Sequence, residues 1–303
     1  MKIALTGGTG FVGSAALEVA LHRAHAVRAL TRREQPTQKD VEWVRGTLDD
    51  TAALADLVTG AETVVHIAGL TNTPNPDRFE AANVTGTANM IAAAKSAGVD
   101  RFVFVSSLSA REPDLSAYGA SKARAEELVK ASGLDWTIVR PPAVYGPRDV
   151  DMFELFRTAK FGIVPVPAEG CTSIIHVEDL ARLLIALVPA NPVTKGHTYE
   201  PWDDNAFGYE HSELAKMIGE AMGNDHAKAL PLPPAVMHFG AKVDGFLRGS
   251  KAKLTPDRVG YMLHPDWVCD MKKAPPISVW QAVWSGADGL RMTADWYKDE
   301  GWL

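Results

Sequence analysis

The sequence predicts an α/β fold built on a doubly wound parallel sheet, and three observations support that prediction. Short apolar or β-branched runs alternate with longer segments of helical spacing through the first half of the chain. A glycine-rich turn joins the first such run to the first helical segment. The 303 residues are 46% hydrophobic and 22% charged, which is the ordinary balance of a protein with a substantial core.

Six runs are predicted to form the strands of this sheet. Helical patterns such as 14–24 and 87–98 separate most of them. The exception is 32–40, which is short and contains Pro36, so we expect a plain loop there. The predicted strands are KIALT (2–6), AVRAL (26–30), VEWVR (41–45), TVVHIA (63–68), RFVFVS (101–106) and WTIVR (136–140).

The charge and the residue composition exclude several classes of function. The net charge is −6 and no basic block is present, so we expect no nucleic-acid partner. Cys171 and Cys269 are far apart, and the nine histidines form no paired ligand motif, so we expect no metal and a reducing, cytoplasmic location. No run approaches the roughly 18 apolar residues that a membrane span requires.

The turn TGGTGFVG, after the first predicted strand, is typical of a dinucleotide-binding loop. Gly7, Gly10 and Gly13 would allow a tight turn, a close approach of pyrophosphate and close packing of helix on strand. The amides around Phe11 and Val12 would then open a helix whose N-terminus attracts phosphate. The alternative is a tight turn without a ligand, which the position at the first strand–helix junction disfavours.

The end of the second predicted strand bears on the choice of dinucleotide. An NAD site usually carries an acidic residue there, to bind the ribose hydroxyls. This chain has Thr31, Arg32 and Arg33 instead, and guanidinium groups suit a 2′-phosphate. We therefore expect NADP, with NAD as the alternative if Arg32 and Arg33 simply face solvent.

The alternating pattern ends after Tyr145, where prolines become frequent. We interpret residues 1–150 as a dinucleotide-binding domain and expect 172–200, a strand running into a helix, to return to it. Residues 151–303 are interpreted as a smaller, irregular and mostly helical substrate region that covers the carboxyl edge of the sheet. Within it, 231–249 predicts an amphipathic helix, which could be a substrate lid or could serve domain packing.

Several ordered motifs resemble those of the extended short-chain dehydrogenase/reductase family, also called the NAD-dependent epimerase/dehydratase family. The resemblance covers nearly the whole chain. Besides the glycine-rich loop, the motifs are VVHIAG (64–69), NVTGT (83–87), FVFVSSLSA (102–110), YGASK (118–122), RPPAVYGP (140–147), IIHVEDLA (174–181) and GLRMTADWY (289–297).

The resemblance implies a catalytic set of Ser107, Tyr118 and Lys122, with Ser106 as the alternative serine. Tyr118 and Lys122 share a helix face, a spacing that on its own would indicate only a polar surface. Lys122 would lower the pKa of the Tyr118 phenol and bind the cofactor ribose, while Ser107 would polarise a substrate carbonyl.

The resemblance also implies further cofactor contacts and a possible homodimer. Asn83 could instead only cap or hold its helix, and His66 and His176 are expected to be framework residues rather than catalysts. The residues implied to contact the cofactor, besides the glycine-rich loop and the catalytic pair, are Leu48, Ala68, Gly69, Asn83, Pro141 and Val144.

Departures from the family pattern favour its dehydrogenase and reductase branches. No acidic residue follows Ser107, where sugar dehydratases carry a pair, and Ala143 replaces the Asn of many nucleotide-sugar enzymes. We therefore expect an NADP-dependent oxidoreductase that interconverts a carbonyl and an alcohol on a small, partly apolar substrate. The alternatives are a nucleotide-sugar epimerase and a non-catalytic NAD(P)H-binding structural or sensor protein.

Overall fold

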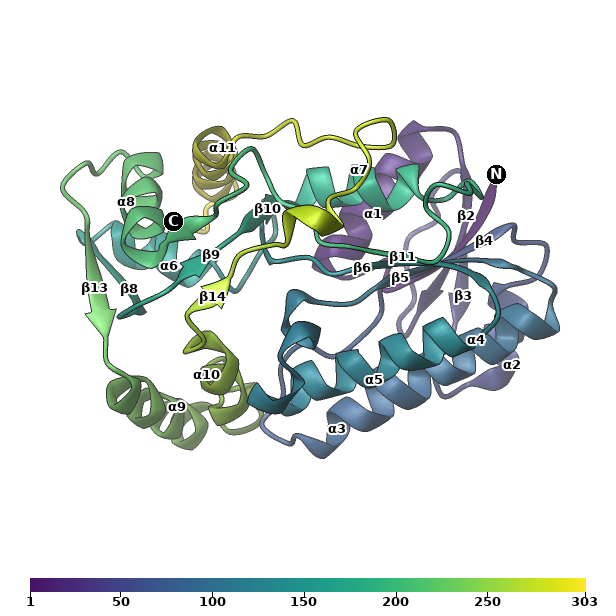
Figure 1. Ribbon diagram of the computed structural model, residues 1–303, viewed down its shortest axis with the longest axis horizontal. Coiled ribbons are helices and arrows are strands. Elements are labelled where there is room, and N and C mark those ends of the chain that lie inside the picture. The colour runs from purple at the N-terminus through teal and green to yellow at the C-terminus, as the bar shows by residue number, and fades with distance from the viewer.

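The computed structural model describes residues 1–303, and its larger part is an open sheet of seven parallel strands (Figure 1). The strand order is β11-β6-β5-β4-β1-β2-β3, so the direction of winding reverses between β1 and β4. The doubly wound fold is therefore confirmed. The strands are β1 (Lys2–Thr6), β2 (Ala26–Thr31), β3 (Val41–Arg45), β4 (Thr63–His66), β5 (Arg101–Val105), β6 (Asp135–Val139) and β11 (His197–Tyr199).

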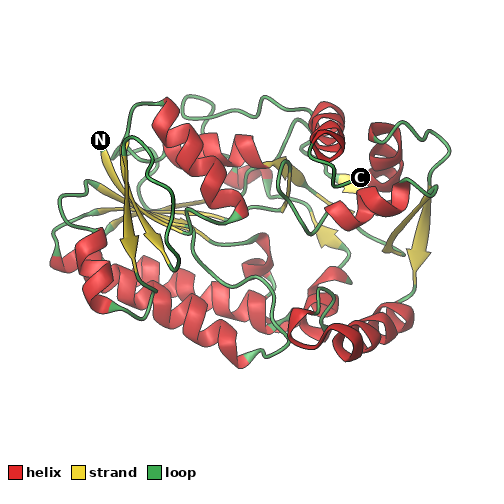
Figure 2. Cartoon of the chain, turned by 180° about the vertical axis from the view of Figure 1, so that it is seen from behind, coloured by secondary structure: helices red, strands yellow, loops and turns green.

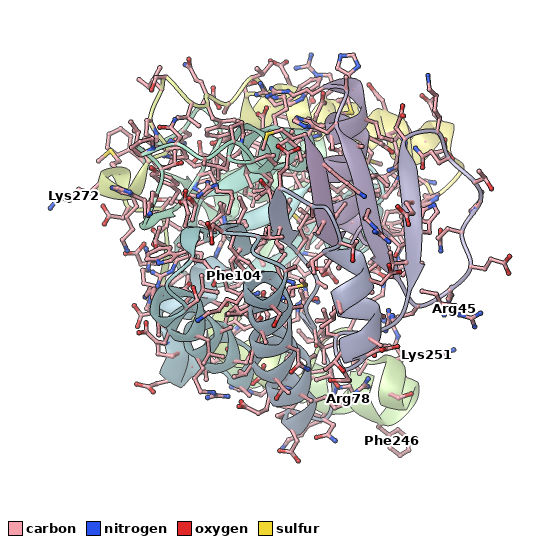
Figure 3. All side chains as sticks on the ribbon, turned by 90° about the vertical axis from the view of Figure 1, so that its right-hand side faces the viewer. Arg45, Arg78, Phe104, Phe246, Lys251 and Lys272 are labelled. Atoms are coloured by element: carbon pink, nitrogen blue, oxygen red, sulfur yellow. The ribbon has the colours of Figure 1, made fainter.

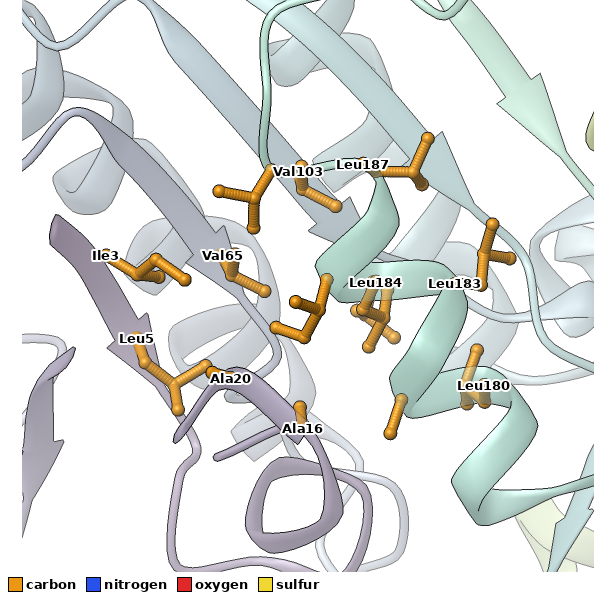
Figure 4. Packing of buried hydrophobic residues seen from close by; sticks show 14 of the residues in the cluster. Ile3, Leu5, Ala16, Ala20, Val65, Val103, Leu180, Leu183, Leu184 and Leu187 are labelled. Atoms are coloured by element: carbon orange, nitrogen blue, oxygen red, sulfur yellow. The ribbon is translucent and has the colours of Figure 1, made fainter. Parts of the chain in front are cut away.

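Helices cover both faces of this sheet, and its strands are therefore buried on both sides. On one face, α1 (Phe11–His22) and α7 (Val177–Ala186) pack together over Leu5, Val65 and Val103 (Figure 4). On the other face lie α2 (Thr51–Leu57), α4 (Gly86–Ser96) and α5 (Ala117–Ala131).

Irregular segments connect these elements at the carboxyl edge. The segment 32–40 forms no helix, as its length and proline predict. A short α3 (Asp77–Phe79) runs into a π-helical turn, Glu80–Thr85, which continues as α4. Two 3₁₀ turns, Leu108–Arg111 and Pro113–Leu115, separate β5 from α5.

The second part of the chain contains more strands than the sequence predicts. Figure 2 shows its helices with three small sheets between them. These strands have two to five residues each, too few for a period-2 pattern to stand out. The strands are β7 (Ala143–Tyr145) with β10 (Ile174–His176), β8 (Ile163–Pro167) with β13 (Lys228–Leu232), and β9 (Cys171–Thr172) with β12 (Tyr209–Glu210) and β14 (Asp266–Trp267).

Five helices complete this part: α6 (Phe153–Ala159), α8 (His211–Ala221), α9 (Pro234–Arg248), α10 (Pro256–Met262) and α11 (Gly286–Asp299). Helices α6, α8 and α11 share a separate apolar core that includes Phe156, Ile218 and Tyr297, whereas α9 and α10 pack on each other in a smaller cluster. Within 172–200, α7 packs on α1 and β11 pairs with β6 of the main sheet, while β10 pairs with β7 in a small sheet. The division into a cofactor and a substrate domain at residue 150 stays a prediction.

No helix in the structure combines the length and the apolar character that crossing a bilayer requires.

Candidate active site

The glycine-rich loop packs too tightly for side chains. Gly7 has a φ of 80°, and a Cβ on it would lie 2.8 Å from the amide nitrogen of Ala68. A Cβ on Gly13 would lie 1.9 Å from the carbonyl oxygen of Gly7. Both contacts are with backbone, so neither glycine can be replaced without moving the loop. The loop therefore brings the start of α1 directly onto the ends of β1 and β4.

The N-terminus of α1 presents free amides at this loop. The amide of Gly10 donates to the carbonyl of Gly7 at 2.9 Å, and no side chain caps the helix. The amides of Phe11, Val12 and Gly13 make no hydrogen bond within the protein. Free amides at a positive helix end suit phosphate oxygens. The residues present thus fit the pyrophosphate of a dinucleotide.

His66 is a framework residue at the end of β4. Its Nδ1 lies 2.7 Å from the hydroxyl of Thr6, and its Nε2 lies 3.1 Å from the hydroxyl of Thr87. The Thr6 hydroxyl also accepts a hydrogen bond from the amide of Ala68 at 3.1 Å. Burial, with a smaller contribution from the charge of Lys122, lowers the pKa of His66 to about 3. A neutral imidazole therefore joins β1, β4 and α4 below the cofactor loop.

Asn83 holds the segment that follows β4. Its side chain lies in the π-helical turn and is almost fully buried. Its Oδ1 accepts from the amide of Leu70 at 2.7 Å, and its Nδ2 donates to the carbonyl of Leu70 and to the hydroxyl of Ser121, both at 2.9 Å. The amide is thus engaged with protein groups, which supports the structural alternative. Direct contact with a cofactor stays a prediction.

The two candidate serines have different surroundings. The hydroxyl of Ser107 opposes the rise in the pKa of the Tyr118 phenol and accepts a hydrogen bond from the hydroxyl of Ser109 at 2.9 Å. Ser106 is buried and donates to Oε1 of Glu126 at 2.6 Å. Glu126 thus engages Ser106, whereas Ser107 influences the Tyr118 phenol, which supports the sequence-based choice between them.

Tyr118 and Lys122 are both buried near the start of α5. Burial raises the pKa of Tyr118 to about 12, although its interaction with Ser107 opposes the rise. Burial also lowers the pKa of Lys122 to about 8, against the opposing effect of Glu126. The expected lowering of the phenol pKa is therefore not seen. Desolvation outweighs other effects, and Nζ of Lys122 donates to the carbonyl of Val105 at 2.7 Å.

The second part of the chain reaches the catalytic helix through α10. Asp257 accepts hydrogen bonds from the amides of Ala117, at 2.6 Å, and Tyr118, at 3.3 Å. The ring of Tyr261 lies 6.0 Å from that of Tyr118, and Phe79 approaches it from another side at 5.7 Å. The contacts of Asp257 and Tyr261 with Tyr118 were not predicted from the sequence. The local sequence TPD signals only the start of a helix, so no pattern linked these residues to Tyr118.

Three arginines lie at the carboxyl ends of β2 and β3. Arg32 and Arg33 follow Thr31, are exposed and form no ion pair in the structure. Arg45, which the sequence analysis missed, lies opposite Thr31 in the register of the two strands and is also exposed. A register that pairs Thr31 with Arg45 could not be inferred before the loop between the strands was placed.

The remaining residues implied to contact the cofactor lie along the same edge of the sheet. Leu48 packs against α4, where a Cβ on Gly86 would approach its side chain to 2.7 Å. The carbonyl of Pro141 accepts from the amide of Leu108 at 2.9 Å, which fixes the turn after Ser107. Val144 in β7 packs against the core formed by α1 and α7. Whether Leu48, Pro141 and Val144 contact the cofactor stays a prediction.

A buried ion network supports the catalytic turn from behind. Arg140 donates to both carboxylate oxygens of Glu126, at 2.8 and 2.6 Å, and also pairs with Glu200. Arg111, which follows Ser107 where dehydratases carry acids, donates to the carbonyls of Val268 and Asp266. These charges join the sheet to the second part of the chain.

A surface cavity of about 520 Å³ lies next to this network, lined by Arg111, His264, Cys269 and Lys273 among others. None of the catalytic residues implied by the sequence lines it. We therefore do not assign it to the reaction.

Known proteins resemble this chain in sequence and in fold. A family model described as NAD(P)H-binding matches residues 7–188. The ceramide reductase of Caulobacter vibrioides is 36% identical, over 99% of this chain and 96% of its own length. The 4-hydroxy-2-methyl-3-oxo-4-farnesyl-3,4-dihydroquinoline-1-oxide ketoreductase of Stigmatella aurantiaca is 31% identical, over 63% of this chain and 66% of its own.

Among solved structures, MoeE5 in complex with UDP-glucuronic acid and NAD has a TM-score of 0.75 over 99% of both chains. At 23% identity this likeness shows the fold alone. Fold, glycine-rich loop and relatives together define an NAD(P)-binding enzyme. The chain belongs to the extended short-chain dehydrogenase/reductase family, as its motifs predict.

Proposed function

We propose that the protein is an NADPH-dependent reductase of a ketone on a long, apolar substrate. The observation that carries the proposal is the buried Tyr118 phenol, which α5 holds together with Lys122 and whose pKa the Ser107 hydroxyl influences. These residues lie at the edge of the sheet that also carries the glycine-rich loop. An acid, a hydrogen-bond donor and a phosphate-binding loop at one sheet edge are the parts that such a reduction needs.

The protonation state of Tyr118 fits the role of a general acid in the reduction. With its pKa raised to about 12, the phenol keeps its proton at neutral pH and can act as a general acid. When bound, the reduced nicotinamide supplies the hydride that the carbonyl carbon accepts. Tyr118 gives its proton to the carbonyl oxygen, and Ser107 donates a hydrogen bond to the same oxygen. The product is the alcohol, and proton uptake from solvent restores the phenol.

Lys122 has a positioning and electrostatic role in this proposal. Its Nζ is anchored on Val105, and it would lie 3.8 Å from a Cβ placed on Gly69, at the end of the cofactor loop region. An ammonium held there can bind ribose hydroxyls and favour negative charge on the phenol after proton transfer.

The preference for NADPH rests on the free guanidinium groups at the end of β2. Arg32 and Arg33 have no partner in the protein, and no carboxylate ends this strand. We include Arg45 in the same cluster because of its register opposite Thr31. Guanidinium groups bind a phosphate monoester through charge-assisted, often bidentate, hydrogen bonds.

The apolar substrate is inferred from the rings around Tyr118 and from the names of the relatives. Phe79 and Tyr261 give the phenol an aromatic environment. Two relatives are named for reductions involving ceramide and a farnesyl-bearing quinoline. Hydride transfer from a nicotinamide does not reduce amides, so on a ceramide-like lipid the reactive group would be a ketone in the chain.

The test is an assay of NADPH oxidation with a ketone-bearing ceramide analogue in detergent. UDP-glucose is assayed in parallel as the substrate that the epimerase alternative would use. We expect turnover of the lipid ketone with NADPH, and turnover at least about a hundredfold slower in Tyr118→Phe. Interconversion of UDP-sugars without net NADPH oxidation would overturn the proposal and select the epimerase alternative. Binding of NADPH without turnover of any ketone would favour the sensor alternative.

A further inference from the structure

Helix α9 carries a continuous apolar stripe that faces away from the rest of the protein. Phe246 is 89% exposed, Leu247 73% and Phe239 67%, and Val236 and Val243 are also exposed. Their spacing of three or four residues places all five on one side of the helix. The opposite side buries only Met237 and Ala241, which pack against Val259 of α10. More large apolar side chains therefore point outward from α9 than inward.

The position of α9 makes this exposure significant. The helix lies at the outer edge of the molecule, at the lower left of Figure 1, with α10 between it and α5. Figure 3 shows Phe246 projecting from the periphery, with Lys251 on the same margin. Contiguous apolar surface of this kind on one helix usually marks a contact with a partner or a membrane. Packing within the chain, one of the two roles considered from the sequence, uses only the inner side of α9.

The charged side chains next to the apolar stripe indicate what kind of surface it would bind. Lys242, Arg248 and Lys251 are exposed, although the whole chain has a net charge of −6. The only acidic residue of the helix, Asp244, is mostly buried and accepts hydrogen bonds from the amides of Lys253 and Leu254. It also pairs with Arg248 at 3.2 Å, which leaves Lys242 and Lys251 as the unpaired cations. The apolar stripe is thus bordered by cations, which is complementary to an anionic surface.

A second copy of the chain fits this surface poorly. In a two-fold symmetric dimer the same patch meets itself, so the cations at the margin of α9 would oppose those of the other copy. An anionic bilayer instead accepts aromatic and aliphatic side chains at the headgroup boundary and attracts lysine and arginine. We propose that α9 docks the protein on an anionic lipid bilayer, with Phe239, Phe246 and Leu247 in the headgroup boundary.

The docked helix is linked to the catalytic site by direct contacts. The chain that follows α9 is held by Asn72, which lies in the loop after β4. The side chain of Asn72 donates to the carbonyls of Ala252 and Lys253 at 3.0 and 3.1 Å. The next helix, α10, carries Asp257, which binds the start of the catalytic helix. A bilayer under α9 therefore lies next to the side of the protein that holds Tyr118. The docking holds whether or not a lipid is the substrate.

The test measures co-sedimentation of the full-length protein with vesicles and needs no enzymatic assay. Vesicles of phosphatidylcholine mixed with phosphatidylglycerol are compared with vesicles of phosphatidylcholine alone. We expect binding to the mixed vesicles that weakens as salt rises. The variant F239S/F246S/L247S should bind at least about tenfold more weakly, because three large side chains no longer leave water.

Matched controls keep the result specific. Phe161 and Phe207 are similarly exposed, at 79% and 78%, but lie outside α9. F161S/F207S should sediment like the wild type, and K242E/K251E should lose the preference for anionic vesicles. Circular dichroism and NADPH affinity verify that each variant is folded.

Three outcomes would overturn the docking proposal. The first is equal sedimentation of the wild type and F239S/F246S/L247S. The second is binding to phosphatidylcholine alone that salt does not change. The third is a dimer in analytical ultracentrifugation that F239S/F246S/L247S abolishes, because it would assign the surface to a second copy. Failure of the reductase assay would leave the sedimentation result unaffected, so the two proposals fail separately.

Discussion

The hydroxyl of Ser106 donates a 2.6 Å hydrogen bond to Glu126, whereas the hydroxyl of its neighbour Ser107 opposes the rise in the pKa of the Tyr118 phenol. Two adjacent serines at the end of one strand thus serve different groups. One completes a buried ion network with Arg140, and the other faces the proposed reaction centre.

The two serines should therefore separate activity from stability. Ser107→Ala should lower kcat by about 10²- to 10³-fold, the usual cost of losing one donor to a developing oxyanion, with little change in unfolding free energy. Ser106→Ala should cost about 1–3 kcal/mol of stability, because Glu126 loses a buried partner. Steady-state kinetics and urea unfolding check both. A larger kcat loss in Ser106→Ala would assign the catalytic role to Ser106.

Tyr118→Phe should lower kcat by about 10²- to 10⁴-fold, the contribution of a positioned general acid, while NADPH affinity stays close to that of the wild type. Single-turnover kinetics and calorimetric titration measure the two effects. A parallel loss of NADPH affinity would mean that the phenol contributes to binding rather than to proton transfer.

The pH dependence should follow Lys122 before Tyr118. The pKa of Lys122 is lowered to about 8, so the free enzyme loses this positive charge as pH rises through 8, and kcat/KM should fall there. The phenol of Tyr118, with its pKa near 12, stays protonated over the same range. Lys122→Arg should remove the decline. An increase of kcat/KM above pH 8 would indicate that the phenolate is the active form.

Removing the guanidinium groups at the end of β2 should change the cofactor preference. Arg32→Ala/Arg33→Ala should weaken NADPH binding by about 10- to 150-fold, the cost of charged hydrogen bonds worth about 1.5–3 kcal/mol, and leave NADH binding unchanged. Arg45→Ala should have a smaller effect in the same direction. Arg23→Ala, at the far end of α1, is the control. Equal losses for NADPH and NADH would contradict a role in binding the 2′-phosphate.

Asp257 should couple the second part of the chain to catalysis. Asp257→Ala leaves the amides of Ala117 and Tyr118 without their acceptor, and should cost about 0.5–2 kcal/mol of stability, as other lost helix caps do. Because the same helix turn positions Tyr118, kcat should fall with little change in KM. Asp257→Asn keeps an acceptor oxygen and should recover most of kcat. A loss of stability without any change in kcat would limit Asp257 to a structural role.

His66 should make the protein sensitive to acid. Its pKa is about 3 in the folded state against 6.5 in the unfolded chain, so the unfolded state binds the extra proton between these values. Stability from this residue is therefore lost as pH falls from 6.5 towards 3, by up to about 1.4 kcal/mol per pH unit. The difference in unfolding free energy between wild type and His66→Gln should shrink over that range. A constant difference would mean that His66 does not titrate between the states.

The sheet and its loop were predictable because their signals are local. The run KIALT, the glycines that follow it and the spacing of Tyr118 and Lys122 are contiguous patterns with a physical cause. The pKa of Tyr118 was not predictable in the same way. Its value depends on how completely distant segments exclude water, and burial by Phe79 and Tyr261 reversed the direction expected from Lys122 alone.

The features that the sequence did not predict depend on contacts between segments that are distant along the chain. Asp257 meets Tyr118 across 139 positions of sequence, and nothing in either segment indicates the other. The pair Cys171–Thr172 forms a strand only because β12 and β14 lie beside it. The amphipathic pattern of 231–249 did predict a helix, but the pattern could not tell which of its sides would be left in water.

The place of α11 in the second core has a consequence for the biosynthesis of the protein. Tyr297 is fully buried and donates to the carbonyl of Asp149 at 2.8 Å, and Gly289 packs directly against Tyr145. A chain synthesised from its N-terminus can complete the cofactor loop long before these partners leave the ribosome. Until then Tyr145 and Phe156 lack their contacts with α11. The nascent protein therefore passes through a stage in which the cofactor loop is formed but apolar side chains of the second core are exposed. Chaperone binding during translation should concentrate in that interval.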